Sequence, residues 1–139
     1  MKQEFETRWQ GGMAFETDLF GHAVVVDAAE GSGGADRGPR PKPLIVAALT
    51  GCTGMDVMDI LRKMRVTVEA LRMRVEVEST EEHPRTYVRL HLVYEFTGRE
   101  ADREHIEKAV RLSQERYCGV SALLRKGLDL TYEVTLTEK

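Results

Sequence analysis

Hydrophobic and polar residues alternate along four stretches of the chain, a pattern typical of strands that bury one face. These stretches cover residues 5–9, 71–78, 88–96 and 128–136. In the last of them, Leu130, Tyr132 and Val134 alternate with polar residues. Because each predicted strand has one polar face, we expect antiparallel sheets that are covered on one side.

Two more strands are predicted near the N-terminus. Gly11-Gly12 follows the first strand and precedes residues 13–17, which is a hairpin signal, and residues 22–27 form a third apolar stretch. Residues 28–42 then contain four glycines, two prolines and two arginines. A segment of this length and composition predicts a flexible loop.

Helical patterns occupy most of the remaining chain. Pro43 suits the first turn of a helix, and residues 44–58 are apolar on nearly every side, so we expect this helix to be surrounded by protein. A second helix is predicted over residues 102–117, with Gly119 as its C-cap, and a short third one over residues 120–126. The predicted order is βββ-α-ββ-α-α-β, which indicates one α+β domain over residues 1–139.

Composition excludes several classes of protein. Hydrophobic residues make up 42% of the chain and charged residues 31%, which rules out general disorder, and the net charge of −3 gives no reason to expect nucleic acid as a partner. The longest uncharged run, residues 43–55, is too short to span a bilayer, so we expect no membrane association. The first residues lack the apolar stretch of a signal peptide, and we therefore expect a cytoplasmic protein with reduced cysteines.

The two cysteines are the candidates for chemistry. Cys52 and Cys118 lie 66 positions apart without any CxxC motif, and four scattered histidines complete no ligand pattern, so we expect neither a metal nor a cofactor. A cysteine inside an apolar helix is usually an inert small residue, and a reactive Cys52 would need a nearby cation such as an arginine. Cys118 is expected to end a helix, where it would be a poor nucleophile but an acceptable disulfide partner. Spacing alone leaves open whether the two sulfurs meet.

Several motifs, taken together, resemble the OsmC/Ohr family. They are Gly38-Pro39-Arg40-Pro41, the run Leu44–Val57 with Ile60–Lys63, then His83–Tyr87, Leu90–Leu92 and Leu112–Ser121. The later motifs point to the YhfA-like branch of the family. The resemblance covers essentially the whole chain and places both cysteines in order.

The resemblance implies a fold and a chemistry. The fold is an intertwined homodimer in which the sheets wrap on two central helices. In the peroxidase members the first cysteine reduces an organic hydroperoxide in oxidative-stress defence, the second resolves the sulfenic acid as a disulfide, and a dithiol restores both thiols. Cys52 matches the first position and Cys118 the second. The activating arginine would come from the upstream loop, as Arg37 or Arg40.

One departure from the family pattern keeps two other functions open. Peroxidase members carry a glutamate nine or ten residues before the first cysteine, and Pro43 and Lys42 occupy those positions here. The first alternative is a non-peroxidatic dimer that binds a small apolar or thiol-reactive ligand near Cys52. The second is a redox-sensitive disulfide without turnover.

Overall fold

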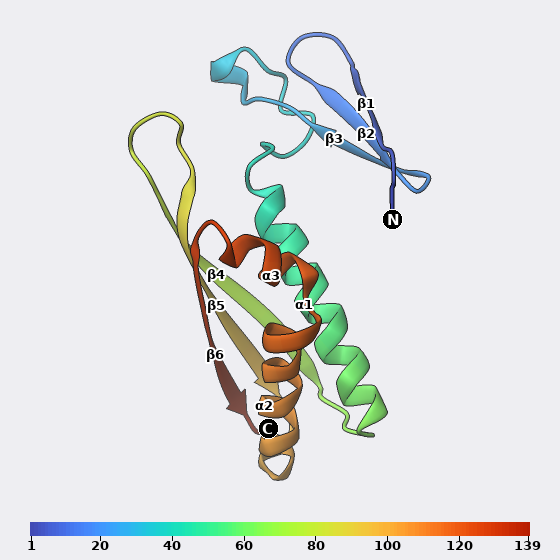
Figure 1. Cartoon of the computed structure of the whole chain (residues 1–139), viewed down its shortest axis with the longest axis vertical. Helices are drawn as coiled ribbons and strands as arrows, with labels where there is room; N and C mark the ends of the chain where they lie inside the picture. Colours follow the sequence, from blue (N-terminus) through green and yellow to red (C-terminus); the bar gives the residue numbers. More distant parts are fainter. The chain divides into compact units, whose positions relative to one another are not determined.

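The computed structural model describes all 139 residues, which form two compact units, residues 1–47 and 48–139. The elements of the first unit are β1 (Glu6–Trp9), β2 (Phe15–Leu19), β3 (His22–Val26) and the 3-10 helix η1 (Glu30–Ser32) (Figure 1). The chain continues through α1 (Leu44–Lys63), β4 (Ala70–Ser79), β5 (Tyr87–Thr97), η2 (Glu100–Asp102), α2 (Arg103–Leu112), η3 (Ser113–Tyr117), α3 (Gly119–Arg125) and β6 (Asp129–Thr137). The predicted α+β class and element order are confirmed.

The first unit is built on an antiparallel sheet of order β1-β2-β3. Gly11 and Gly12 both have positive φ, 88° and 56°, in the turn between β1 and β2. Glycine reaches this region without the steric cost that other residues meet, so the Gly-Gly pair forms the hairpin as predicted. The second strand begins at Phe15, two residues later than the pattern indicated.

The segment between β3 and α1 is organised around Asp27. The carboxylate of Asp27 is buried and accepts backbone N–H bonds from Ala28, Ala35 and Arg37 at 2.8–3.2 Å. These bonds, with that of Arg37 first, hold the pKa of Asp27 below its ordinary value. One carboxylate thus binds the backbone at three positions of a loop that has little regular secondary structure.

The sheet of the second unit has the order β4-β5-β6. β4 and β5 are antiparallel, but β5 and β6 are parallel, with Arg89 opposite Asp129 and Thr97 opposite Thr137. The expectation of purely antiparallel sheets is therefore wrong for this pair. Alternation reveals one buried face but not the direction of a neighbour, and the long segment between β5 and β6 permits a parallel return.

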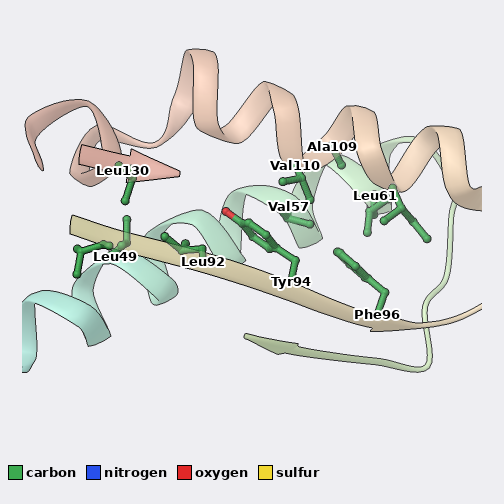
Figure 2. Packing of buried hydrophobic residues seen from close by; sticks show 11 residues of the cluster. Leu49, Val57, Leu61, Leu92, Tyr94, Phe96, Ala109, Val110 and Leu130 are labelled. Carbon is green, nitrogen blue, oxygen red and sulfur yellow. The ribbon is translucent and has the colours of Figure 1, made fainter. Parts of the chain in front are cut away.

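Two helices pack on one face of this sheet. Leu90, Leu92, Tyr94 and Phe96 alternate along β5 and are buried, and they meet Leu49, Val57 and Leu61 of α1 and Ile106, Ala109 and Val110 of α2. Figure 2 shows these side chains between the strand and the helices. Gly54 lets the side chain of Met73 on β4 approach α1 closely, because a Cβ at position 54 would lie 2.9 Å from Cε of Met73. The central helices of the expected fold are thus α1 and α2.

α1 is only partly covered in the single chain, and the expectation that protein surrounds it stays a prediction for the dimer. Its most apolar stretch is only 28% buried, and Met55 is 77% exposed. By length and composition α1 is also the one helix that could cross a membrane, a test that core helices pass as well. Since Leu49, Val57 and Leu61 belong to the core, α1 is a core helix, and Met55 and Met58 are exposed apolar residues on it.

The second predicted helix consists of two parts. α2 ends at Leu112, and η3, a π-helical turn, continues it to Tyr117. The N–H of Cys118 donates to the carbonyl oxygen of Ser113 at 2.8 Å and closes this wider turn. α3 begins directly after Cys118.

We predict that Leu92→Ala lowers the free energy of unfolding by about 2–5 kcal/mol, because it removes a fully buried side chain from the sheet face covered by both helices. Val88→Ala on the same strand is the matched control, since Val88 is exposed and its truncation should change stability by about 0.5 kcal/mol or less. Urea denaturation of both variants measures the difference. Equal losses would contradict the assignment of this face to the core.

Candidate functional site

Two thiols and a carboxylate meet in the second unit. The Sγ atoms of Cys52 and Cys118 and a carboxylate oxygen of Asp56 all lie within 4.8 Å of one another. Cys52 and Asp56 stand one helical turn apart on α1, on the same face, and Cys118 comes from the junction between η3 and α3. Both cysteines are free thiols.

Cys118 ends one helix, as expected, and begins the next. It is the C-cap of η3 and also the N-cap of α3, with extended backbone dihedrals and its Sγ accepting the backbone N–H of Ser121 at 3.4 Å. Its side chain is 3% exposed. The sequence did not indicate the second role: the π-helical turn closes at Cys118, and α3 starts directly after it.

The surroundings of Cys52 favour the neutral thiol. Burial raises the pKa of Cys52 most, and the neighbouring Cys118 and the negative charge of Asp56 raise it further. A backbone N–H from Val120, in the first turn of α3, donates to Cys52 and acts in the opposite direction. The two charged or ionisable groups that shift this pKa most are both acidic.

Behind the thiols lies a buried hydrogen-bonded chain. Tyr94 Oη lies 2.7 Å from Thr53 Oγ1, which lies 2.7 Å from Ser113 Oγ, and Ser113 donates to Oδ2 of Asp56 at 3.1 Å. Gln114 Nε2 donates to Tyr94 Oη at 2.6 Å. Arg125 donates to the carbonyl and side-chain oxygens of Gln114, both at 2.7 Å.

These contacts determine which hydroxyl group is the donor in each hydrogen bond of this series. Ser113 has a single hydroxyl proton and gives it to Asp56, so Thr53 must donate to Ser113 and Tyr94 must donate to Thr53. Burial raises the pKa of Tyr94, which keeps the phenol protonated as this role requires. Donation therefore runs in one sense from Arg125 to the Asp56 carboxylate.

The candidate activating arginines are engaged within the first unit. Arg37 lies 3.6 Å from the carboxylate of Asp27 and donates to the carbonyls of Gln10 and Gly11. Arg40 donates to the carbonyls of Asp27 and Gly38 and forms an ion pair with Asp36 at 2.7 Å. Both guanidinium groups thus have partners that organise the loop.

A groove of about 480 Å³ lies between α1 and the segment that runs from the end of α2 into η3. It is lined by Asp56, Asp59, Ile60, Lys63, Met64, Leu112 and Tyr117. Asp56 belongs both to the groove and to the thiol cluster, so the groove and the cluster share one carboxylate. The apolar lining of Ile60, Met64 and Leu112 suits a small organic group.

Sequence reasoning singled out neither Asp56 nor the buried chain behind it. Asp56 and Cys52 share a helix face, so the i,i+4 spacing could have drawn attention to the pair. Thr53, Tyr94, Ser113 and Gln114 carried no such signal, since their partners lie 20 to 61 residues away.

We predict that alkylation of Cys52 by iodoacetamide has a pH midpoint above that of an ordinary thiol, which is about 8.5. Peptide mass spectrometry can follow Cys52 and Cys118 separately. Asp56→Asn should lower the midpoint, because it removes a negative charge that opposes the thiolate. Asp59→Asn is the control, since that carboxylate pairs with Lys63 at 2.9 Å. A midpoint below pH 7 in the wild type would contradict the prediction.

Comparison with known proteins identifies the family. The family model described as "OsmC-like protein" matches residues 33–133. The protein named "Protein YhfA" from Escherichia coli K12 is 33% identical over 130 residues, covering 91% of this chain and 94% of its own.

Solved structures agree with this relationship. A hypothetical protein from Aquifex aeolicus VF5 superposes with a TM-score of 0.79 at 25% identity, covering 99% of this chain and 98% of its own. The organic hydroperoxide resistance protein OhrB of Bacillus subtilis superposes with a TM-score of 0.66 at 16% identity over 97% of this chain and 98% of its own, which is a likeness of fold. With a family model over more than half of its length and a relative at 33% identity along most of it, the chain belongs to the OsmC-like protein family.

Proposed function

We propose that this protein reduces organic hydroperoxides with its two thiols, Cys52 as the peroxidatic and Cys118 as the resolving cysteine, in cytoplasmic oxidative-stress defence. The observation that carries the proposal is the approach of two free sulfurs from separate elements to within 4.8 Å. A disulfide requires a bond of about 2 Å, which side-chain rotation and a small shift of the α3 N-terminus would allow. Organic hydroperoxide resistance proteins among the fold neighbours support a redox role.

The proposed reaction proceeds in three balanced steps. The Cys52 thiolate attacks the terminal oxygen of the hydroperoxide, the O–O bond breaks, and the alkoxide takes a proton and leaves as an alcohol. Cys118 then attacks the sulfur of the resulting sulfenic acid, forming the disulfide and releasing water. A dithiol reductant exchanges with this disulfide and restores both thiols.

Activation of Cys52 is the demanding part of this mechanism. Its pKa is raised mainly by burial, so little thiolate exists at neutral pH, and the Val120 N–H is the group that favours the anion. The negative charge of Asp56 disfavours the Cys52 thiolate, but the carboxylate can accept the proton that the Cys52 thiol releases. Asp56 would thus act as a base at a site that lacks the glutamate of the peroxidase members. We therefore expect slower turnover than an arginine-activated thiol would give.

A homodimer is part of the proposal, because each unit leaves apolar surface exposed. On α1, Met55 and Met58 are exposed, and in the first unit Trp9 and Phe20 are exposed as well. Apolar patches of this kind are typical of interfaces between subunits. A second copy of this chain would cover them.

The second candidate function is binding of a small apolar or thiol-reactive ligand without turnover. The groove lined by Asp56 favours it, because Ile60, Met64 and Leu112 offer apolar contact in the same groove as a carboxylate that lies within 4.8 Å of the Cys52 sulfur. A redox-sensitive disulfide without turnover would use the same pair of sulfurs.

We predict that the reduced wild type consumes an organic hydroperoxide in the presence of a dithiol and that Cys52→Ser lowers consumption to the uncatalysed rate. Cys118→Ser should allow one turnover and then accumulate a sulfenic acid, since no resolving thiol remains, and dimedone labelling with mass spectrometry detects that product. Wild type that neither consumes hydroperoxide nor labels at Cys52 would overturn the peroxidase and leave the ligand-binding candidate.

We also predict a dimer that depends on the exposed face of α1. Met55→Asp should shift the protein toward the monomer in sedimentation velocity, because the substitution places a charge in the proposed apolar interface. Lys108→Asp, on the exposed side of α2, is the charge-changing control and should leave the sedimentation coefficient unchanged. A folded wild-type monomer at low micromolar concentration would contradict the prediction.

A further inference from the structure

We propose that Cys52, Asp56 and Cys118 bind a zinc ion. Two thiolate sulfurs and a carboxylate oxygen are ligands that zinc accepts, and three protein ligands leave a fourth position for water. The spacing of the cysteines in the sequence predicted no such site, because the ligands come from α1 and from the α3 N-cap, 66 residues apart. The proposal does not depend on peroxidase activity.

The distances suit a tetrahedral ion after a small contraction. Two thiolates bound to zinc at about 2.3 Å lie about 3.8 Å from each other in a tetrahedron. The three ligand atoms here already lie within 4.8 Å of one another without a metal. Closing the remaining distance requires about 1 Å, which rotation of the three side chains supplies.

Each ligand is held by a hydrogen bond from outside the cluster. Ser113 donates to Oδ2 of Asp56, and Ser113 itself bonds to Thr53. Backbone N–H groups at the start of α3 donate to the two sulfurs, Val120 to Cys52 and Ser121 to Cys118. Contacts of this kind orient the ligands of protein metal sites.

The turn that carries Cys118 also holds a buried polar atom without a partner. The hydroxyl of Ser121 is fully buried and has no hydrogen-bond partner in the protein. Its own backbone N–H donates to Cys118, so the hydroxyl belongs to the turn that carries one ligand. Buried hydroxyls are normally satisfied, and a water on the fourth position of the ion would supply a partner.

The charge of the site favours a cation. The carboxylate of Asp56 lies beside the two sulfurs, and the nearby Arg125 is engaged with Gln114. A divalent ion would offset the electrostatic repulsion among the two thiolates and the carboxylate. Binding should therefore release protons from the thiols.

Zinc binding and disulfide formation exclude each other. Oxidation removes two electrons from the paired thiolates, forms the S–S bond, reduces the hydroperoxide to alcohol and water, and releases the zinc ion unchanged. The disulfide lacks thiolate ligands and cannot bind the ion again until a dithiol reduces it. The same two sulfurs thus alternate between a metal-bound and an oxidised form.

The test is a titration of reduced, metal-free, full-length protein with Co²⁺ as a spectroscopic probe, followed by Zn²⁺. We expect one ion per chain, thiolate-to-cobalt charge-transfer bands in the near ultraviolet, and their loss when zinc displaces cobalt. Wild type alkylated with iodoacetamide and wild type oxidised to the disulfide should show no bands. Absence of the bands in the reduced protein would overturn the proposal.

Two matched variants test the third ligand. Asp56→Asn should weaken zinc binding by about tenfold or more, whereas Asp59→Asn, on the same helix, should leave it unchanged. Circular dichroism confirms that each variant is folded, and alkylated wild type supplies the ligand-free comparison without any substitution. Equal zinc affinity in Asp56→Asn and wild type would overturn the three-ligand site. Peroxidase activity without metal binding would refute this inference alone, and metal binding without peroxidase activity would refute the proposed function alone.

Discussion

The parallel pairing of β5 with β6 determines where the thiols of this protein can meet. Parallel neighbours cannot be joined by a short turn, so the chain must return along the sheet before β6 begins. α2 and α3 make that return on the face where α1 also packs, and the break between them holds Cys118. Cys52 lies on α1, and the crossover therefore brings the second sulfur to the first.

The hydrogen-bonded chain behind the thiols connects this geometry to the core. It joins α1 through Thr53, β5 through Tyr94, η3 through Ser113 and Gln114, and α3 through Arg125. In surroundings of low polarity such bonds strengthen one another, and loss of one leaves a buried partner unsatisfied. The position of Asp56 is thus set by the packing of four elements, and a shift in any of them would move the carboxylate through these hydrogen bonds.

How much of this could be predicted from the sequence depends on the range of the interaction. The alternation around Leu92 and the apolar run from Leu44 gave the elements and their order, because both patterns are local. The direction of β6 was missed, since residues such as Leu130 and Tyr132 look the same in parallel and antiparallel neighbours. Sequence motifs indicated both cysteines, but neither their separation nor the place of Cys118 at a helix start could be obtained without the π-helical turn.

That turn accommodates one residue more than a regular helix would hold at this point. Each residue of an α-helix advances by about 100° around the axis, so loss or gain of one residue turns everything after it by that angle. η3 holds one residue more per turn than an α-helix would, and the Cys118 N–H reaches back to Ser113 across it. The wider turn takes up this extra residue locally, whereas an unbroken α-helix would pass it on as a rotation of about 100° to everything that follows. The π-helical turn therefore lets the segment carry one more residue and still present Cys118 toward α1.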